Sequence, residues 1–321
     1  MEIRPPSRTP LNILISRLSA LGDCVCTLPV AVALKKSFPE SRITWAVDPR
    51  FAGIIECCPS VDEIQRVKPG FKPASWPSFE TKFDVALDMQ GLSKSGLVVA
   101  RARAGKKLGY HWQRELAPLF SAPVKPDPSS LHVVDQYVDV ARAAGAECDR
   151  ADFGMQPSED DRTKCKDLLS EHGVKGPFVV LNAGAGWATK RWPAAHFARL
   201  SEMIAAKGIS AVFIGGKAEA DLQAFREVEH ETKVPILNFL GKTSVRELVS
   251  LISLSNAHVG GDTGSSHVAA ALGVPAIGLY SITKPARSCP YGQIHRCHYE
   301  VSGLKDIQPE AVYNTVWEAV S

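Results

Sequence analysis

The stretch Val259-Gly-Gly-Asp-Thr-Gly-Ser-Ser-His267 joins a short apolar run to a helical stretch that begins at once. Small residues at such a junction let a ligand approach the backbone. The first N–H groups of a helix have no partner within it, so they bind anions such as phosphate. Alternatively, Asp262 or Thr263 only caps the helix. Capping needs neither the neighbouring glycines nor His267, one turn beyond Thr263, so the pattern favours an anion site.

Strands and helices alternate on both sides of this turn. The second half of the chain shows strands at 178–182, 211–215, 236–237, 257–260 and 276–279, with helices at 193–206, 219–229, 244–254 and 264–272. The first half shows strands at 11–16, 43–47 and 83–87, with helices at 24–37, 93–104 and 133–144. This alternation predicts an α/β protein with parallel sheets and helices on both faces.

The chain has 321 residues, more than one hydrophobic core usually fills, so two domains are expected. The polar stretch at 147–161 is the best place for a boundary. We therefore predict one Rossmann-like domain over residues 1–155 and a second over 156–308. Pro309 suits the first turn of a last helix, over 309–321.

Composition excludes several classes of function. The 37 Lys and Arg residues barely outnumber the 34 Asp and Glu residues and form no block, so nucleic acid is not a favoured partner. We see no signal peptide and no apolar run of the roughly 20 residues that a membrane helix needs. The eight cysteines form no C-x-x-C pair, which favours reduced, structural thiols in the cytoplasm and no metal site.

Two more strand-to-helix turns of the second half carry candidate ligand contacts, because ligands bind beyond the carboxyl ends of parallel strands. Residues 181–193 hold Gly184 and then Lys190, a cation that could neutralise a diphosphate. A third glycine is missing at Thr189, so a dinucleotide fingerprint is poorly supported. Glu219, just after a strand, could accept hydrogen bonds from a ribose or could simply be a solvated first-turn glutamate.

In the first half, residues 16–23 place the carboxylate of Asp23 after the first strand. Asp23 could act as a general base or could cap the following helix. Residues Gly241-Lys-Thr243 look like the end of a P-loop, but Ile236 stands where that motif requires glycine, so an NTPase is not expected.

Taken together, these turns resemble those of the bacterial lipopolysaccharide heptosyltransferases, glycosyltransferase family 9, over essentially the whole chain. The stretches that carry the resemblance are Ser19–Pro29, Asp88–Ser95, Lys190–Trp192 and Gly261–His267. Residues 88–95 and 109–115 are most similar to the branch that adds the first heptose to Kdo. The resemblance implies a GT-B fold of two facing Rossmann-like domains, with a C-terminal helix that crosses back to the first domain.

The resemblance also implies an inverting, metal-independent transfer of heptose from ADP-heptose to the Kdo of the lipopolysaccharide inner core, without a cofactor. Asp23 would be the catalytic base, and Lys190 would stabilise the departing diphosphate. The implied nucleotide-sugar contacts are Gly184, Lys190, Glu219, Thr243, Asp262, Thr263, Gly264 and His267. The implied acceptor contacts are Gln90, Lys94 and Arg114.

The partners then expected are a nucleotide sugar and a lipid-anchored saccharide, met by a monomer at the inner face of the inner membrane. Two alternatives remain at this stage. One is a family 9 transferase with another nucleotide sugar or acceptor, and the other is a nucleotide-dependent oxidoreductase that uses the same Rossmann geometry.

Overall fold

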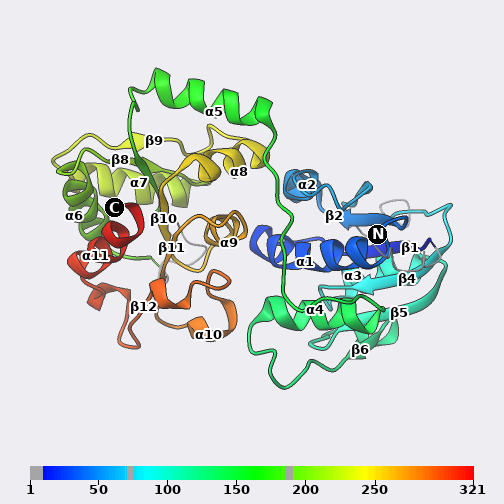
Figure 1. Ribbon diagram of the computed structural model, residues 1–321. Helices are drawn as coiled ribbons and strands as arrows, with labels where there is room; N and C mark the ends of the chain where they lie inside the picture. Colours follow the sequence, from blue (N-terminus) through cyan, green and yellow to red (C-terminus); the bar gives the residue numbers. More distant parts are fainter. Residues whose placement is uncertain (1–9, 69, 71–75, 185–190) are drawn as a thin grey trace, which may run out of the picture. The chain divides into compact units, whose positions relative to one another are not determined.

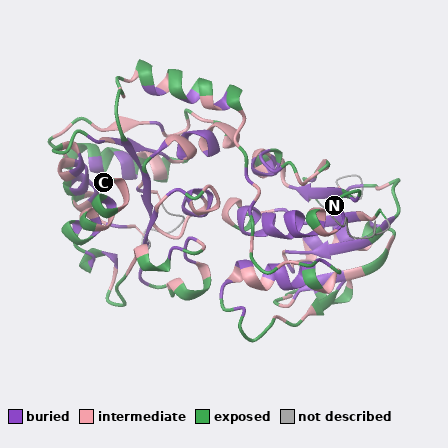
Figure 2. Ribbon diagram, in the orientation of Figure 1, coloured by how far each residue is buried: buried purple, intermediate pink, exposed green. Residues whose placement is uncertain are grey.

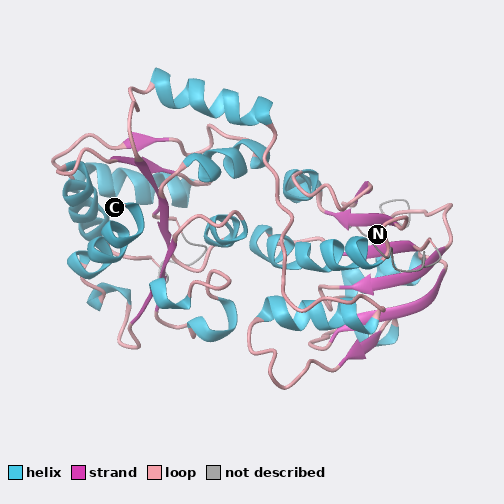
Figure 3. Cartoon of the chain, in the orientation of Figure 1, coloured by secondary structure: helices cyan, strands magenta, loops and turns pink. Residues whose placement is uncertain are grey.

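The computed structural model describes residues 10–68, 70, 76–184 and 191–321. The chain forms two compact units, Met1–Gln156 and Pro157–Ser321, whereas the sequence placed the boundary after residue 155. Each unit has one sheet of parallel strands with helices on both faces (Figures 1 and 3), which is the fold class that the alternation predicted.

The sheet of the first unit has the order β3-β2-β1-β4-β5-β6. Its strands are β1 (Asn12–Ser16), β2 (Arg42–Val47), β3 (Glu63–Arg66), β4 (Phe83–Asp88), β5 (Ala104–Tyr110) and β6 (Ala122–Val124). Its helices are α1 (Leu21–Ser37), α2 (Ala52–Glu56), α3 (Ser93–Arg101) and α4 (Val133–Ala143), with short 3-10 turns η1 (Pro49–Phe51) and η3 (Ala117–Leu119). Helices α1 and α4 pack together, and α3 packs on β1 and β4.

The sheet of the second unit has the order β12-β11-β10-β7-β8-β9. Its strands are β7 (Phe178–Asn182), β8 (Ser210–Phe213), β9 (Leu237–Asn238), β10 (Ala257–Gly260), β11 (Ala276–Tyr280) and β12 (Cys297–Tyr299). Its helices are α5 (Glu159–Glu171), α6 (Ala194–Ala205), α7 (Glu219–Glu231), α8 (Val245–Leu254), α9 (Gly264–Ala271), α10 (Pro285–Ser288) and α11 (Pro309–Val320), with 3-10 turns η5 (Ile294–Arg296) and η6 (Leu304–Asp306).

Both sheets have the doubly wound strand order, in which the chain starts in the middle and works outward in two directions. The point of reversal lies between β1 and β4 in one sheet and between β7 and β10 in the other. The last residues of these neighbouring strands are level, since Ser16 pairs with Asp88 and Asn182 pairs with Gly260. The turns that follow the two strands therefore begin side by side.

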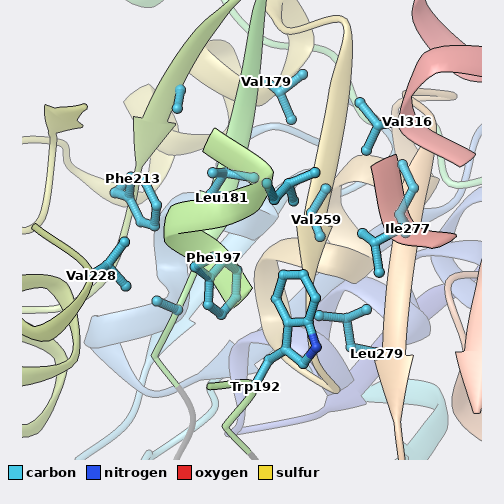
Figure 4. Close-up of a cluster of buried hydrophobic side chains, with 14 of the residues drawn as sticks. Val179, Leu181, Trp192, Phe197, Phe213, Val228, Val259, Ile277, Leu279 and Val316 are labelled. Carbon is cyan, nitrogen blue, oxygen red and sulfur yellow. The ribbon is translucent and has the colours of Figure 1, made fainter. Parts of the chain in front are cut away.

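Apolar side chains fill the space between each sheet and its helices, and Figure 2 shows the strands as mostly buried. In the second unit, the core includes Leu181, Val259, Phe197 and Phe213 (Figure 4). Trp192 joins this core at the start of α6 and donates a hydrogen bond from Nε1 to the Ile307 carbonyl at 2.9 Å. Parallel strands buried on both faces read as continuous apolar runs, which is why the sequence revealed β7 and β10.

The last helix contributes to the core of the second unit. Helix α11 packs on α6, β10 and β11, and the expected contact of this helix with the first domain stays a prediction. Val312 and Val316, one turn apart, are fully buried in the core of that unit. The sequence predicted this helix from Pro309 and did not show which surface it would cover.

Two observations bear on the exclusions made from composition. All eight cysteines are free thiols, and no three His, Cys, Asp or Glu residues gather as a metal site among the described residues. In the same part of the chain, no helix is both long and apolar enough to cross a bilayer.

Candidate functional site

The turn between β10 and α9 presents free backbone donors. Thr263 is the N-cap residue of α9, yet its side chain makes no capping hydrogen bond to the helix. Its hydroxyl instead lies 3.0 Å from that of Ser265 and 3.2 Å from that of Ser266. Ser266 in turn donates to the Gly261 carbonyl at 2.8 Å. The first-turn N–H groups at Gly264 and Ser265 therefore lie at a helix end without a side-chain cap, an arrangement that can bind an anion.

Asp262 and His267 flank this turn. The Oδ1 atom of Asp262 lies 3.8 Å from Nε2 of His267, and both side chains are largely buried. A hollow beside Asp262 is lined by the turn after β11, Tyr280–Thr283. The structure thus brings together Asp262, Thr263, Gly264 and His267, as the sequence predicted for a single anion site.

Three polar residues that the sequence analysis did not single out form hydrogen bonds at this turn: Asn182, His258 and Ser265. The Ser265 hydroxyl receives a hydrogen bond from Asn182 Nδ2 at 2.9 Å and lies 2.9 Å from Nε2 of His258. Burial, with a smaller contribution from His267, lowers the pKa of His258 to about 3. His258 is therefore neutral at physiological pH. Asn182 ends a buried strand and precedes a small-residue turn, which is the signal that could have identified it.

The turn after β7 reaches the same edge of the sheet. Gly184 lies so close to Asp221 that a Cβ atom added at Gly184 would meet Asp221 Oδ1 at 2.6 Å. Asp221 also accepts a hydrogen bond from the Gly216 N–H at 2.8 Å, which joins the turns after β7 and β8. The sequence analysis missed Asp221. Lys190, the predicted diphosphate-binding cation, lies outside the described residues.

The two predicted nucleoside contacts lie farther along the same edge. Glu219 is the first residue of α7, after β8, where it is exposed and forms an ion pair with Arg226. Thr243 follows β9 and lines a groove between α5 and α8. In the strand order, β8 is two strands from β10 and β9 is three strands from it, so these two residues are not part of the anion turn itself.

In the first unit, Asp23 lies in the first turn of α1, directly after β1. Its Oδ2 atom accepts a hydrogen bond from the Ala20 N–H at 3.1 Å, and its Oδ1 atom lies 2.6 Å from Nη2 of Arg17. Half of the Asp23 side-chain surface is exposed. Asp23 thus helps to cap α1 and still presents its carboxylate to solvent, so the two interpretations of the sequence are compatible.

The turn after β4 is joined to the turn that precedes Asp23. Gln90 accepts a hydrogen bond from the Leu18 N–H at 3.0 Å and donates one to the Ser19 hydroxyl at 3.2 Å. Lys94 Nζ also donates to the Ser19 hydroxyl, at 3.1 Å. The predicted acceptor residues Gln90 and Lys94 therefore share Ser19 as a partner, close in sequence to Asp23.

Arg114 belongs to a third turn, after β5. Its backbone N–H donates to the Gly91 carbonyl at 2.8 Å, and its guanidinium lies 5.9 Å from the ring centre of Trp112. Gly91 has a φ of +68°, and a Cβ atom there would meet the Trp112 carbonyl oxygen at 2.6 Å. This position therefore requires glycine. The close approach brings Arg114 to the turn that carries Gln90 and Lys94.

Asp88 shapes the same turn from within the sheet and was not among the predicted site residues. Its Oδ1 atom accepts hydrogen bonds from the backbone N–H groups of Gln90 at 3.1 Å and Gly91 at 2.9 Å. Burial raises the pKa of this carboxyl group above its ordinary value. A buried, hydrogen-bonded carboxylate at a strand end is a structural support for the loop that follows.

Both units thus place polar and charged groups at the reversal point of a doubly wound sheet, where ligands of such folds bind. Residues 78–310 match the model of glycosyltransferase family 9 (heptosyltransferase). The chain belongs to glycosyltransferase family 9. It is therefore a glycosyltransferase, and the oxidoreductase alternative is set aside.

Individual proteins agree with this assignment. The chain is 26% identical over 294 residues to the lipopolysaccharide core heptosyltransferase OpsX of Haemophilus influenzae, covering 90% of this chain and 84% of that one. The solved structure of the family 9 glycosyl transferase from Veillonella parvula superposes with a TM-score of 0.84 at 22% identity over 97% of each chain. The E. coli heptosyltransferase WaaC with ADP-2-deoxy-2-fluoro heptose superposes with a TM-score of 0.72 at 23% identity, over 96% of this chain and 99% of that one. These likenesses confirm the GT-B fold class.

Proposed function

We propose that this enzyme transfers heptose from ADP-heptose to the Kdo of the lipopolysaccharide inner core, with inversion and without a metal ion. The observation that carries the proposal is the pair of reversal points, one with an exposed carboxylate at Asp23 and one with an anion-binding helix end at Thr263 and Gly264. The names of the similar proteins support heptose as the sugar and ADP as the nucleotide.

The second unit would hold the donor. The N–H groups at the start of α9 bind oxygens of the diphosphate and stabilise the negative charge that grows on it as ADP departs. Lys190 adds a positive charge to the same group. Asp262 and His267, on either side of the turn, contact the sugar next to the diphosphate. These charged and polar groups take the part that a metal ion plays in other transferases.

The first unit would hold the acceptor. Asp23 takes the proton from the acceptor hydroxyl while that oxygen forms a bond to the anomeric carbon of the heptose, and the bond from this carbon to the diphosphate oxygen breaks. Attack from the face opposite the departing ADP inverts the anomeric centre. Lys94 and Arg114 are cations that suit the carboxylate of Kdo, and Gln90 adds hydrogen-bonding capacity.

The donor assignment is tested by thermal-shift measurements with ADP, UDP, GDP and their sugars. A ligand at about 100 times its dissociation constant stabilises the folded protein by roughly 2.7 kcal/mol. We expect stabilisation by ADP and ADP-heptose. Stabilisation by another nucleotide sugar and none by ADP-heptose would overturn the proposed donor.

The transfer itself is tested with ADP-heptose and a Kdo-lipid A acceptor, with and without a chelator. We expect equal rates in both conditions and a strongly reduced but measurable rate of transfer in Asp23→Asn, which keeps the shape of the side chain and an oxygen for Arg17. ADP binding should be unchanged in this variant. Transfer by Asp23→Asn at the normal rate would show that Asp23 is not the base.

A further inference from the structure

Arg17 is a buried cation that directly follows β1. Only 5% of its side chain is exposed. One end of its guanidinium, Nη1, donates to the Met89 carbonyl in the turn after β4. The central carbon of the guanidinium, Cζ, lies 5.3 Å from the centre of the Tyr137 ring on α4. The other end, Nη2, forms the 2.6 Å ion pair with Asp23.

These contacts make Arg17 an unusually fixed partner for a carboxylate. A guanidinium that is removed from water is costly unless it is paired, so the buried charge favours the arrangement in which Asp23 stays beside it. The planar guanidinium fork is held by a strand-end carbonyl and an aromatic ring, which leaves it little freedom to turn. The half-exposed Asp23 carboxylate is therefore paired with a guanidinium that is buried and has two further partners.

We propose that Arg17 is the positioning residue of the reaction: it holds the Asp23 carboxylate in the orientation from which Asp23 takes the acceptor proton. The proposal rests on the proposed function, in which Asp23 is the base. Arg17 holds Oδ1, and the Ala20 N–H holds Oδ2. Each carboxylate oxygen retains a free lone pair, so these contacts orient the group and leave it able to accept a proton.

Arg17 also connects the base to the acceptor side of the unit. Met89, which accepts from Nη1, directly precedes Gln90, and Gln90 binds the Leu18 N–H and the Ser19 hydroxyl. The turn of Asp23 and the turn of the predicted acceptor residues are thus fixed to one another through this guanidinium and Gln90. A displacement of about 1 Å in such an arrangement can reduce a rate 10²-fold.

The test is a double-mutant cycle on transfer, with Arg17→Met, Asp23→Asn and the two combined. We expect Arg17→Met to lower kcat roughly 10²-fold and to leave the KM for ADP-heptose unchanged, because the donor residues belong to the other unit. In the Asp23→Asn background, Arg17→Met should slow transfer by no more than about twofold, because Arg17 acts through the carboxylate that is already lost. Arg17→Lys keeps the charge and loses the fork, so it should recover part of the rate.

Controls separate this role from a general structural one. Arg50→Met removes an exposed arginine that pairs with Asp48 in the turn after β2, and it should leave transfer unchanged. Melting temperature and ADP binding are measured for every variant. Should Arg17→Met fail to fold, Arg17→Lys carries the same cycle.

The outcomes distinguish this inference from the proposed function. Normal transfer by Asp23→Asn would overturn the assignment of the base. Slow transfer by Asp23→Asn together with normal transfer by Arg17→Met or Arg17→Lys would overturn the role of Arg17 alone. If the rate reductions of the two single variants multiply in the double variant, Arg17 acts independently of Asp23. That result would also overturn the role of Arg17.

Discussion

The Nε2 atom of His258 lies 2.9 Å from the hydroxyl of Ser265, so a fully buried imidazole supports the turn at which α9 begins. The Ser265 hydroxyl also accepts a hydrogen bond from the side-chain amide of Asn182, at the end of β7. One hydroxyl thereby joins the two central strands of the second sheet at the point where they end. The turn that we propose binds the diphosphate therefore contacts a buried histidine through Ser265.

The pKa of His258 makes stability depend on pH. Burial lowers it from 6.5 to about 3, so between these values the unfolded chain takes up a proton that the folded chain does not. The free energy of unfolding that depends on a neutral His258 is therefore fully present above pH 6.5, and it falls as the pH decreases toward 3. This group alone should remove roughly 2–3 kcal/mol at pH 4.5. Urea unfolding at pH 7 and 4.5 measures the effect, and His258→Asn should show a smaller difference between the two conditions. The exposed His230→Asn serves as control and should behave as the wild type.

Replacement of Ser265 should weaken nucleotide binding. In Ser265→Ala, the His258 and Asn182 side chains lose a buried partner, which costs about 1–3 kcal/mol, and the turn loses its support. We expect the dissociation constant for ADP to rise about tenfold, measured by calorimetry. Ser201→Ala is the matched control, because this buried hydroxyl donates to the Phe197 carbonyl within α6 at 2.8 Å. Equal ADP affinity in the two variants would argue against a role for Ser265.

Gly91→Ala should affect both stability and the acceptor. The positive φ and the close Trp112 carbonyl mean that a methyl group is strained at this position, at a cost of about 1–3 kcal/mol. The turn that carries Arg114 must then move away. We expect a lower melting temperature and a higher KM for the acceptor, with the KM for ADP-heptose unchanged. Gly176→Ala, where a Cβ atom would meet nothing within 4 Å, should change neither quantity.

The packing of α11 can be tested by removing a buried methyl pair. Val316→Ala leaves a cavity in the core of the second unit and should lower its stability by about 1–3 kcal/mol. Because we propose that this unit binds the donor, added ADP should raise the melting temperature of the variant. The exposed Glu318→Ala should be neutral. An unaffected melting temperature in Val316→Ala would contradict the position of α11 in this core.

The parts of the fold that sequence revealed are those whose pattern is local. Strand β7 is apolar up to its last residue, Asn182, and β10 is apolar except for His258. The small residues after β10 indicate that a ligand can approach the backbone closely. Strand β5 was missed because Ala104–Tyr110 carries two lysines and two glycines and reads as a loop. Helix α5 was missed because it buries only Asp161, Cys165 and Leu169, so its apolar face is too narrow to show.

The site was partly predictable for a similar reason. Asp23, Asp262 and His267 stand next to turns and could be found from their neighbours in the chain. Arg17, Asp88 and His258 acquire their roles from contacts between strands that are distant in sequence. Arg17 and Met89, for example, are 72 residues apart. No local pattern announces such a pair, and the buried charge or imidazole becomes visible only in the folded unit.

The position of α11 has a consequence for how enzymes of this kind can diversify. Because the last helix completes the core of the second unit, that unit is a single uninterrupted stretch of chain from Pro157 to Ser321. One crossover between two related genes, near the codon for Gln156, would exchange the whole second unit together with the core that α11 completes. Recombination could then match an existing nucleotide-sugar preference to a new acceptor without a period of unstable intermediates.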